Sequence, residues 1–350
     1  MLERSNPKHK VGKLEMIPLE GRKIVLVGGA GFIGHHLALT LKERGADVHV
    51  LDSLQINNLE AFQKSEEDIP NRDQYIRILK ERLDLLEKAG VPLHVQDARD
   101  YHELSKKLGE IRPQVIVQLA AVSHAGKSNK DPFSTFDHSL RALENALDNT
   151  RADYLEHFIY FSSSMVYGHF PAGFVDEETI CHPLGIYGAL KYAGEKIVDA
   201  YEQVFKVPVT TIRPSALYGE RCVSRRVGQI FIENAMEKLD VTISGDGSDS
   251  LDFTYVGDLV QGVIKCIENE NARGEIFNLT YGASRTIAQM ADILKEYFPE
   301  VTINYVPKDA LTPDRGTLSV EKAKRLIGYD PQWPLEKGFP KYIEWYKSTW

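Results

Sequence analysis

The sequence predicts an α/β protein with a doubly wound parallel sheet and a smaller C-terminal α/β lobe. From Lys23 onward, short β-branched runs alternate with amphipathic helical stretches, and a glycine-rich turn follows the first run. Such alternation is typical of repeated βαβ units and of a parallel sheet buried on both faces. The expected strands cover residues 23–28, 48–51, 93–96, 115–119, 158–162 and 209–213.

The domain organisation follows from where this alternation begins and where it weakens. Residues 1–21 form a charged N-terminal arm, and residues 22–215 carry the alternating pattern. Glycine and proline become more frequent further on, which indicates shorter elements and a smaller lobe over 216–350. Part of 251–280 is expected to return to the main sheet. Within 55–90 a helical insertion is expected, because apolar residues recur there at helical spacing, namely Ile76, Leu79, Leu83 and Leu86.

The composition excludes several classes of protein. The chain has 350 residues, with 42 Lys and Arg against 50 Asp and Glu and a net charge of -8, the wrong sign for binding nucleic acid through counterion release. Its 3 cysteines are too few and too scattered for a disulfide framework or a spaced metal site. The histidines show no metal-ligand spacing either, so no metal is expected. Because the sequence lacks an apolar run of about 18 residues and a signal-peptide pattern, we expect a cytoplasmic protein without a membrane span.

The glycine-rich turn predicts a dinucleotide site. Gly28, Gly31 and Gly34 lie between the first expected strand and the helix that follows it. In a Rossmann-type βαβ unit, these glycines turn the chain, let the backbone approach a pyrophosphate and pack the helix on the strand, while the helix N-terminus offers N–H groups to the phosphates. Asp52 ends the second strand, where a carboxylate accepts hydrogen bonds from the adenosine ribose and repels a 2′-phosphate. The predicted cofactor is therefore NAD rather than NADP.

Asp97 follows the third expected strand, and two interpretations of it stay open. Its carboxylate is suited to accept a hydrogen bond from the adenine amino group, or to cap the helix expected to begin at Tyr101. The spacing alone does not choose between them.

Two tyrosine–lysine pairs follow the fifth expected strand: Tyr187 with Lys191, and Tyr192 with Lys196. The members of each pair lie one helical turn apart, but the two pairs point about 140° apart, so only one can face a cofactor. A tyrosine with a pKa near the usual value of about 10 is a poor base at neutral pH unless a nearby cation stabilises the phenolate. A serine at a strand end can hold the hydroxyl whose proton the tyrosinate removes. Surface packing of either pair is the alternative.

Several motifs occur together in an order known from one enzyme family. They are GGAGFIG, Asp52, Asp97, the LAA of residues 119–121, SSSMVYG, YGALK, RPSALYG and GDGSDSLDFTYVGDLV. From about Lys23 to its C-terminus the chain resembles the NAD-dependent epimerase/dehydratase family of extended short-chain dehydrogenases/reductases, and within it the nucleotide-sugar enzymes of the UDP-galactose 4-epimerase type.

The resemblance implies roles for individual residues. By position, Ser163, Tyr187 and Lys191 match the family's catalytic residues, and the second tyrosine–lysine pair is left to packing and the surface. The smaller lobe would bind a nucleotide-diphosphate sugar, and family members often form homodimers through two helices, one of which carries the tyrosine and lysine. The implied NAD contacts are Gly28, Gly31, Phe32, Ile33, Gly34, Asp52, Asp97, Ala98, Leu119, Ala120, Ala121, Tyr187 and Lys191.

The residues after Ser163 bear on the reaction. Family members first oxidise C4 of the sugar. The 4,6-dehydratases then use an Asp-Glu pair directly after the Ser/Thr. The decarboxylases usually have a glutamate, and the GDP-fucose synthases a cysteine, at the second position after the Ser/Thr. This chain has Ser164 and Met165 at these two positions. We therefore expect 4-epimerisation through a transient 4-keto intermediate. A nucleotide-sugar 4-dehydrogenase that releases a keto product, and a non-catalytic NAD or sugar sensor, stay open as alternatives.

The chain departs from the family pattern where the nucleotide is held. Leu251 replaces the arginine of the family's Arg-Asp-Phe/Tyr motif, and Ala216 replaces an asparagine. Guanidinium groups elsewhere are suited to replace the lost diphosphate ligand, or form a solvated basic patch; they are Arg221, Arg225, Arg226 and Arg315, with Arg315 the first choice.

Contacts to the sugar are expected from the loop after the LAA segment and from the turn that carries the catalytic serine. The residues in question are Ser123, His124 and Ser164. A histidine in such a loop is more often a substrate contact or a packing residue than an acid or base.

Overall fold

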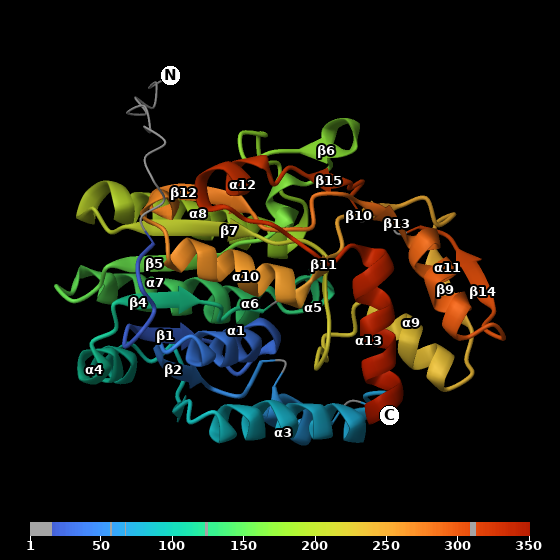
Figure 1. Cartoon of the computed structure of the whole chain (residues 1–350), viewed down its shortest axis with the longest axis horizontal. Helices are drawn as coiled ribbons and strands as arrows, with labels where there is room; N and C mark the ends of the chain where they lie inside the picture. Colours follow the sequence, from blue (N-terminus) through green and yellow to red (C-terminus); the bar gives the residue numbers. More distant parts are fainter. Residues whose placement is uncertain (1–15, 57, 67, 123–124, 309–312) are drawn as a thin grey trace.

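The computed structural model describes residues 16–56, 58–66, 68–122, 125–308 and 313–350. At its centre is a seven-stranded parallel sheet with the order β12-β7-β5-β4-β1-β2-β3 (Figure 1). The doubly wound sheet predicted from the sequence is confirmed, and the six expected strands are present to within one residue at each end. The strands are β1 (Lys23–Val27), β2 (Asp47–Asp52), β3 (Leu93–Val95), β4 (Val115–Gln118), β5 (His157–Phe161), β7 (Val209–Arg213) and β12 (Glu275–Asn278).

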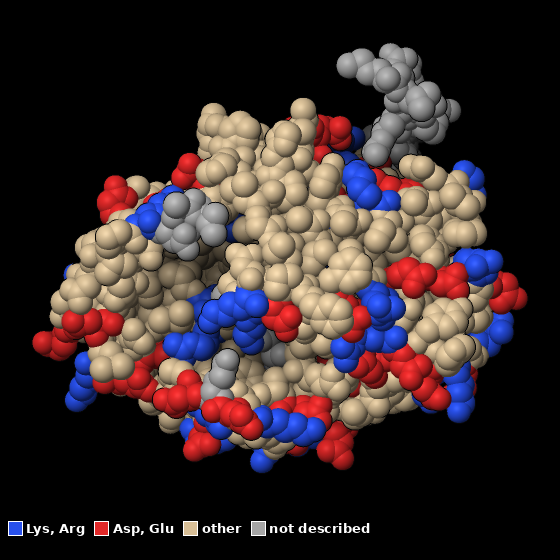
Figure 2. Space-filling model, turned by 180° about the vertical axis from the view of Figure 1, so that it is seen from behind, with Lys and Arg blue, Asp and Glu red and all other residues tan. Residues whose placement is uncertain are grey.

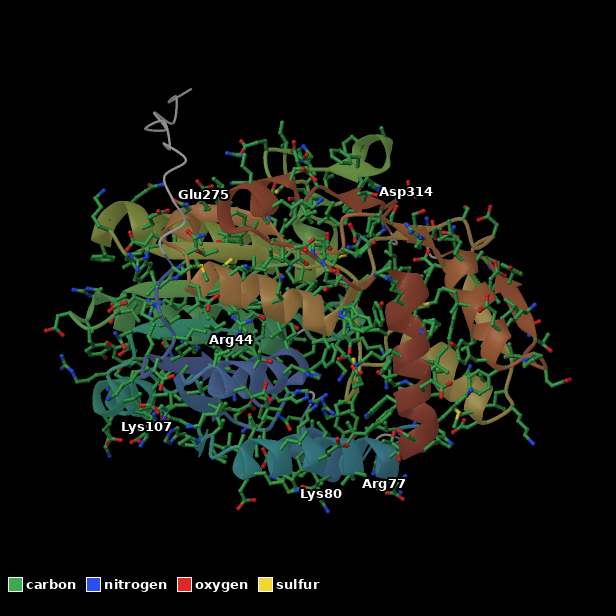
Figure 3. All side chains as sticks on the ribbon, in the orientation of Figure 1. Arg44, Arg77, Lys80, Lys107, Glu275 and Asp314 are labelled. Atoms are coloured by element: carbon green, nitrogen blue, oxygen red, sulfur yellow. The ribbon has the colours of Figure 1, made fainter. Side chains whose placement is uncertain are left out.

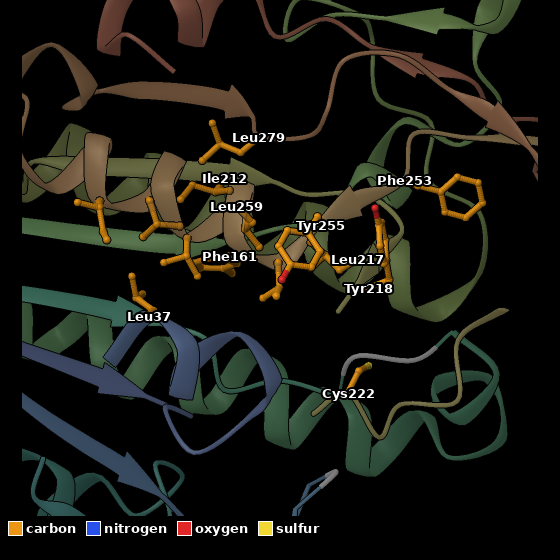
Figure 4. Packing of buried hydrophobic residues seen from close by; sticks show 14 of the residues in the cluster. Leu37, Phe161, Ile212, Leu217, Tyr218, Cys222, Phe253, Tyr255, Leu259 and Leu279 are labelled. Carbon is orange, nitrogen blue, oxygen red and sulfur yellow. The ribbon is translucent and has the colours of Figure 1, made fainter. Parts of the chain in front are cut away.

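Helices cover both faces of the sheet because its strands are apolar on both sides. α1 and α10 pack on one face, where Leu37, Phe161, Ile212 and Leu259 meet in the main core (Figure 4). α4, α7 and α8 pack on the other face. Each fully buried side chain of this kind contributes about 1.5–3 kcal/mol to folding. The helices are α1 (Phe32–Glu43), α2 (Leu59–Lys64), α3 (Arg72–Lys88), α4 (Tyr101–Ile111), α5 (Ala125–Lys130), α6 (Pro132–Phe136), α7 (Ala142–Asp148), α8 (Gly185–Phe205), α9 (Val227–Met236), α10 (Val256–Ile267), α11 (Ile287–Tyr297), α12 (Glu321–Ile327) and α13 (Leu335–Thr349).

The stretch 251–280 adds the outermost strand of the main sheet, because β12 pairs in parallel with β7 and places Glu275 opposite Thr210. The remainder of the C-terminal part is built from two-stranded sheets and helices, and α9, α11 and α13 of it lie to the right in Figure 1. The short strands are β6 (Phe174–Val175), β8 (Leu217–Tyr218), β9 (Val241–Ser244), β10 (Ser250–Leu251), β11 (Thr254–Tyr255), β13 (Arg285–Thr286), β14 (Ile303–Val306) and β15 (Thr317–Leu318).

The segment 55–90 forms α2 and α3, as its apolar spacing predicts. Tyr75 and Leu79 of α3 are fully buried and pack with Val223 of the smaller lobe. The outer side of α3 is charged, and Figure 3 shows Arg77 and Lys80 there. The insertion therefore joins the α1 side of the sheet to the smaller lobe.

Two further observations concern the chain as a whole. The part of the N-terminal arm that is described begins with Met16, which forms a β-bridge with Asn269 after α10. Within the described ranges, no helix combines the length and apolar character needed to cross a membrane.

Candidate functional site

A cavity lies at the carboxyl ends of β1 and β4, where the strand order reverses and doubly wound folds bind their ligands. All the predicted NAD contacts apart from Tyr187 and Lys191 line it. Residues that the sequence did not single out also line it, and they are Leu51, Ser53, Ile56, Gln96, Arg99, His138, Ala142, Leu217 and Ser224. His138 belongs to a π-helical turn, Asp137–Arg141, a feature for which the sequence gives no signal.

The glycine loop fits a pyrophosphate. Gly28 has a φ of +81°, and a Cβ there would lie 2.6 Å from the backbone nitrogen of Ala120. At Gly34 a Cβ would lie 2.5 Å from the Cα of Gly29. No side chain caps the N-terminus of α1, and its first turn contains no acidic residue. The N–H groups at this end are therefore available to an anion.

Asp52 presents a carboxylate to the same cavity. Its Oδ2 accepts from the N–H of Ala30 at 3.0 Å and its Oδ1 from the N–H of Leu54 at 2.8 Å. Burial raises the pKa of Asp52 to about 6, although these backbone hydrogen bonds oppose the shift. Each carboxylate oxygen keeps a second lone pair, so both can still accept a ribose hydroxyl.

Asp97 is not a helix cap, and that interpretation is wrong. The N-cap of α4 is Asp100, whose side chain accepts from the N–H of Glu103 at 3.1 Å. Asp97 instead binds the guanidinium of Arg99 at 2.6 Å. Burial opposes ionisation, but the bonds from Arg99 prevail and lower the pKa of Asp97. It lines the cavity as an ionised acceptor.

Ser163, Tyr187 and Lys191 line a second cavity of about 360 Å³. Ser163 lies two residues after the end of β5, where its Oγ accepts from the N–H of Met165 at 3.2 Å. Lys191 lies one turn after Tyr187 on α8, and its Nζ donates to the carbonyl oxygen of Phe161 at 2.7 Å. Burial lowers the pKa of Lys191 to about 8, against the opposing charge of Glu195. The cation is thus held at the strand end, in the cavity that Tyr187 lines.

The second tyrosine–lysine pair lies elsewhere. Tyr192 packs beside the buried cluster that contains Tyr167 and Phe170, and Lys196 pairs with Asp199 at 3.1 Å. Neither residue lines the cavity. The packing of α8 therefore shows which of the two tyrosine–lysine pairs lines the cavity, which the spacing in the sequence could not decide.

The two cavities adjoin, since both are lined by Ile33, Leu119, Ala121, Leu217 and Arg226. Figure 2 shows a hollow on this side of the molecule with Lys and Arg side chains beside it. In the second cavity the charged side chains are those of Lys191, Arg225, Arg226 and Arg315, and none of the described lining residues is Asp, Glu, His or Cys. This cavity therefore favours an anionic ligand.

The predicted arginines separate into two groups. Arg225, Arg226 and Arg315 line the second cavity, as Ser164 does, but Arg221 lines neither cavity. The Nε of Arg221 donates to His35 at 3.0 Å and an Nη lies 3.3 Å from Glu81, so the expectation that it binds diphosphate finds no support. Ser123 and His124 lie outside the described residues.

A buried polar network lies beside the end of β5, close to Ser163. The carboxylate of Glu195 accepts from Ser162 Oγ at 2.5 Å and from two nitrogens of Arg213 at 2.9 and 2.7 Å. Arg213 also donates to the hydroxyl of Tyr167 at 2.9 Å. Because Glu195 lies one turn after Lys191, this network holds α8 in register with the end of β5.

The sheet, the glycine loop and the Ser-Tyr-Lys set define an enzyme of the extended short-chain dehydrogenase/reductase class. A sequence model of the NAD dependent epimerase/dehydratase family matches residues 24–280. The chain belongs to this family, which confirms the resemblance, and its cofactor is NAD.

Several known proteins of similar sequence and structure are named as UDP-sugar 4-epimerases. The chain is 28% identical to a putative UDP-glucose 4-epimerase of Methanocaldococcus jannaschii, over 93% of this chain and 99% of that protein. The crystal structure of UDP-glucuronic acid 4-epimerase from Bacillus cereus, in complex with UDP-glucuronic acid and NAD, is similar with a TM-score of 0.82 at 25% identity, covering 94% of this chain and 100% of that one. UDP-glucose 4-epimerase from Thermotoga maritima, with UDP-glucose, has a TM-score of 0.81 at 25% identity, covering 93% and 99%.

Proposed function

We propose that this chain is an NAD-dependent 4-epimerase of nucleotide-diphosphate sugars. The observation that carries the proposal is the second cavity, which adjoins the NAD site, contains Ser163, Tyr187 and Lys191, and has no carboxylate, imidazole or thiol in its described wall. Eliminating water requires acid–base groups in addition to the tyrosine, whereas epimerisation uses one tyrosine in both directions. The names of the similar proteins support the same reaction.

The residues of the cavity account for the proton transfers. Ser163 accepts from a backbone N–H and keeps its own O–H to orient the C4 hydroxyl. Lys191 places a cation beside Tyr187, which stabilises the phenolate that removes the C4 proton. Gly28, Gly31, Gly34 and Asp52 would hold NAD, which would supply a hydride acceptor for oxidation at C4 and the hydride donor for reduction of the 4-keto sugar from its opposite face.

The test is a proton NMR assay of the purified protein with UDP-, GDP-, CDP- and dTDP-hexoses and hexuronates, with and without added NAD. We expect one donor to yield its C4 epimer, and Tyr187→Phe to lower the rate by about 10²–10⁴-fold. Tyr192→Phe is the matched control, because it removes the same hydroxyl five residues further along the same helix, and its rate should stay near that of the unmodified chain.

Other outcomes of this assay would overturn the proposal. NADH formed in proportion to a released keto sugar would indicate the 4-dehydrogenase. Tight binding of sugar nucleotide and NAD without any chemistry would indicate a sensor. Equal rates for Tyr187→Phe and the unmodified chain would contradict the proposed mechanism.

We also propose that the enzyme works in the cytoplasm as a homodimer. The resemblance supports this proposal. Exposed apolar side chains support the dimer: Phe133 on α6 is 86% exposed, Val204 near the end of α8 is 68% exposed, and Ile186 near the start of α8 is exposed as well. Light scattering should give twice the mass of the chain, 39.5 kDa, and Val204→Lys should shift the protein toward monomer. A monomeric unmodified chain would contradict the dimer.

A further inference from the structure

Arg315 extends into the second cavity, beside the turn that carries Ser163. Its Nη2 donates to the hydroxyl of Ser164 and, at 2.8 Å, to the hydroxyl of Ser215. Its Nη1 lies 3.7 Å from the Sδ of Met165. These partners come from the turns that follow β5 and β7, so the guanidinium lies at the reacting end of the cavity.

The charge of Arg315 has no ionic partner in the described part of the chain. The neighbouring Asp314 points outward, with its side chain 75% exposed, and pairs with Lys308 at 3.0 Å (Figure 3). The buried Asp252 accepts from the N–H groups of Leu318 and Gly282 and forms no ion pair with Arg315. The Nε of Arg315 is buried and has no hydrogen-bond partner among those residues.

The positive charge around Arg315 also favours an anionic ligand. Burial, and then the nearby guanidinium of Arg226, lower the pKa of Arg315 to about 10, so the group remains a cation at neutral pH. Both arginines line a cavity whose described wall carries no acid. A cation enclosed in this way is stabilised when an anionic ligand supplies the missing charge.

The location of Arg315 distinguishes between the two anionic groups of a sugar nucleotide. Ser164 directly follows Ser163, the residue assigned to the C4 hydroxyl. In a pyranose, a C6 carboxylate is attached to C5, next to C4, whereas the diphosphate is attached to C1 on the far side of the ring. An anion held by Ser164 and Arg315 therefore belongs to the sugar.

We propose that Arg315, Ser164 and Ser215 bind a carboxylate at C6, and that the substrates are nucleotide-diphosphate hexuronates in preference to neutral hexoses. This inference rests on the proposed function, since it takes Ser163 as the residue that binds the C4 hydroxyl. Both serine hydroxyls accept from Arg315, so their O–H groups are left to donate to the carboxylate. A neutral hydroxymethyl group offers no charge to the guanidinium.

The test compares UDP-glucuronate with UDP-glucose. Affinities are measured by calorimetry on the NAD-loaded Tyr187→Phe variant, and kcat/KM by proton NMR on the chain with Tyr187 intact. We expect UDP-glucuronate to be preferred by about 10- to 100-fold, the range of one or two charge-assisted hydrogen bonds. Arg315→Met should abolish the preference, and Arg315→Lys should retain part of it. Arg112→Met, which removes an exposed guanidinium on the surface, is the control and should leave it unchanged.

Each contrary result has a separate meaning. Equal or better use of UDP-glucose overturns the carboxylate site and leaves the epimerase proposal standing. If Arg315→Met weakens UDP-glucuronate, UDP-glucose and free UDP equally, the anion is the diphosphate and the inference is wrong. Binding of UDP-glucuronate through Arg315 without a C4 epimer supports the site and overturns the proposed function. Failure of both sugars to bind overturns the inference.

Discussion

We expect the buried carboxylate of Asp52 to make the affinity for NAD depend on pH. Two of its lone pairs already accept backbone N–H groups, and a proton on either oxygen would take a lone pair that a ribose hydroxyl needs. Burial raises the pKa of Asp52 to about 6 in the NAD-free protein. The ionised fraction is then about nine-tenths at pH 7 and about one-tenth at pH 5, so the dissociation constant for NAD should rise about tenfold over this interval.

The direction of this effect follows from the linkage between binding and ionisation. NAD binds the ionised form, so binding releases a proton at low pH and the affinity declines as the pH falls through the raised pKa. Calorimetric titration of NAD into cofactor-stripped protein between pH 5 and 8 measures it, and circular dichroism at each pH confirms that the protein stays folded. A flat profile for the unmodified protein would refute the reasoning.

Two variants isolate the carboxylate responsible. Asp52→Asn should bind NAD more weakly and lose the tenfold change with pH. Asp252→Asn is the control, because burial also raises the pKa of Asp252 to about 6 but this residue does not line the cofactor cavity. If Asp52→Asn keeps the pH dependence and Asp252→Asn loses it, the effect has been assigned to the wrong residue.

Further predictions concern the residues around the catalytic cavity. Lys191→Met removes the cation beside the catalytic tyrosine, so kcat should fall by about 10²–10⁴-fold and the pH optimum should rise in an NMR rate profile; an unchanged optimum would contradict this. Glu195→Ala leaves the buried guanidinium of Arg213 without its carboxylate, and urea unfolding should show a loss of about 3–5 kcal/mol, with a loss below about 1 kcal/mol arguing against a buried ion pair. Tyr75→Phe removes the hydroxyl to which Arg225 donates at 3.1 Å, so KM for the sugar nucleotide should rise about 3- to 10-fold while kcat stays the same; a change in kcat alone would show that the contact acts on the chemistry.

The features that local chemistry determines could be predicted from the sequence. β-branched runs bounded by turns located the strands, since a strand buried on both faces has to be apolar throughout. The glycine triplet and Asp52 were predicted to line one site and do line one cavity, because a close backbone approach and a ribose-binding carboxylate each demand one residue type at one position. Tyr187 was separated from Tyr192 only through the resemblance, because both lie on the same helix at the same spacing from a lysine.

The loop before α9 could not be predicted, because contacts between distant segments determine its shape. Arg221 and Arg225 adopt positive φ values of 62° and 50°, which are strained for arginine and are sustained only by the surrounding structure. The side chain of Arg221 donates a hydrogen bond to His35 of α1, and the side chain of Arg225 donates one to Tyr75 of the insertion. No pattern within the loop itself says which arginine faces the cavity.

The insertion helix α3 helps to hold one wall of the second cavity. Glu233 of α9 accepts from Tyr75 at 2.6 Å and from Tyr346 of the last helix at 2.8 Å, and Tyr75 also bonds Arg225 in the cavity wall. The side of the second cavity that carries Arg225 is therefore positioned by segments that lie outside the main sheet. Exchange of α3, α9 and α13 as a matched set would reshape this side of the cavity and leave the ends of β5 and β7 as they are.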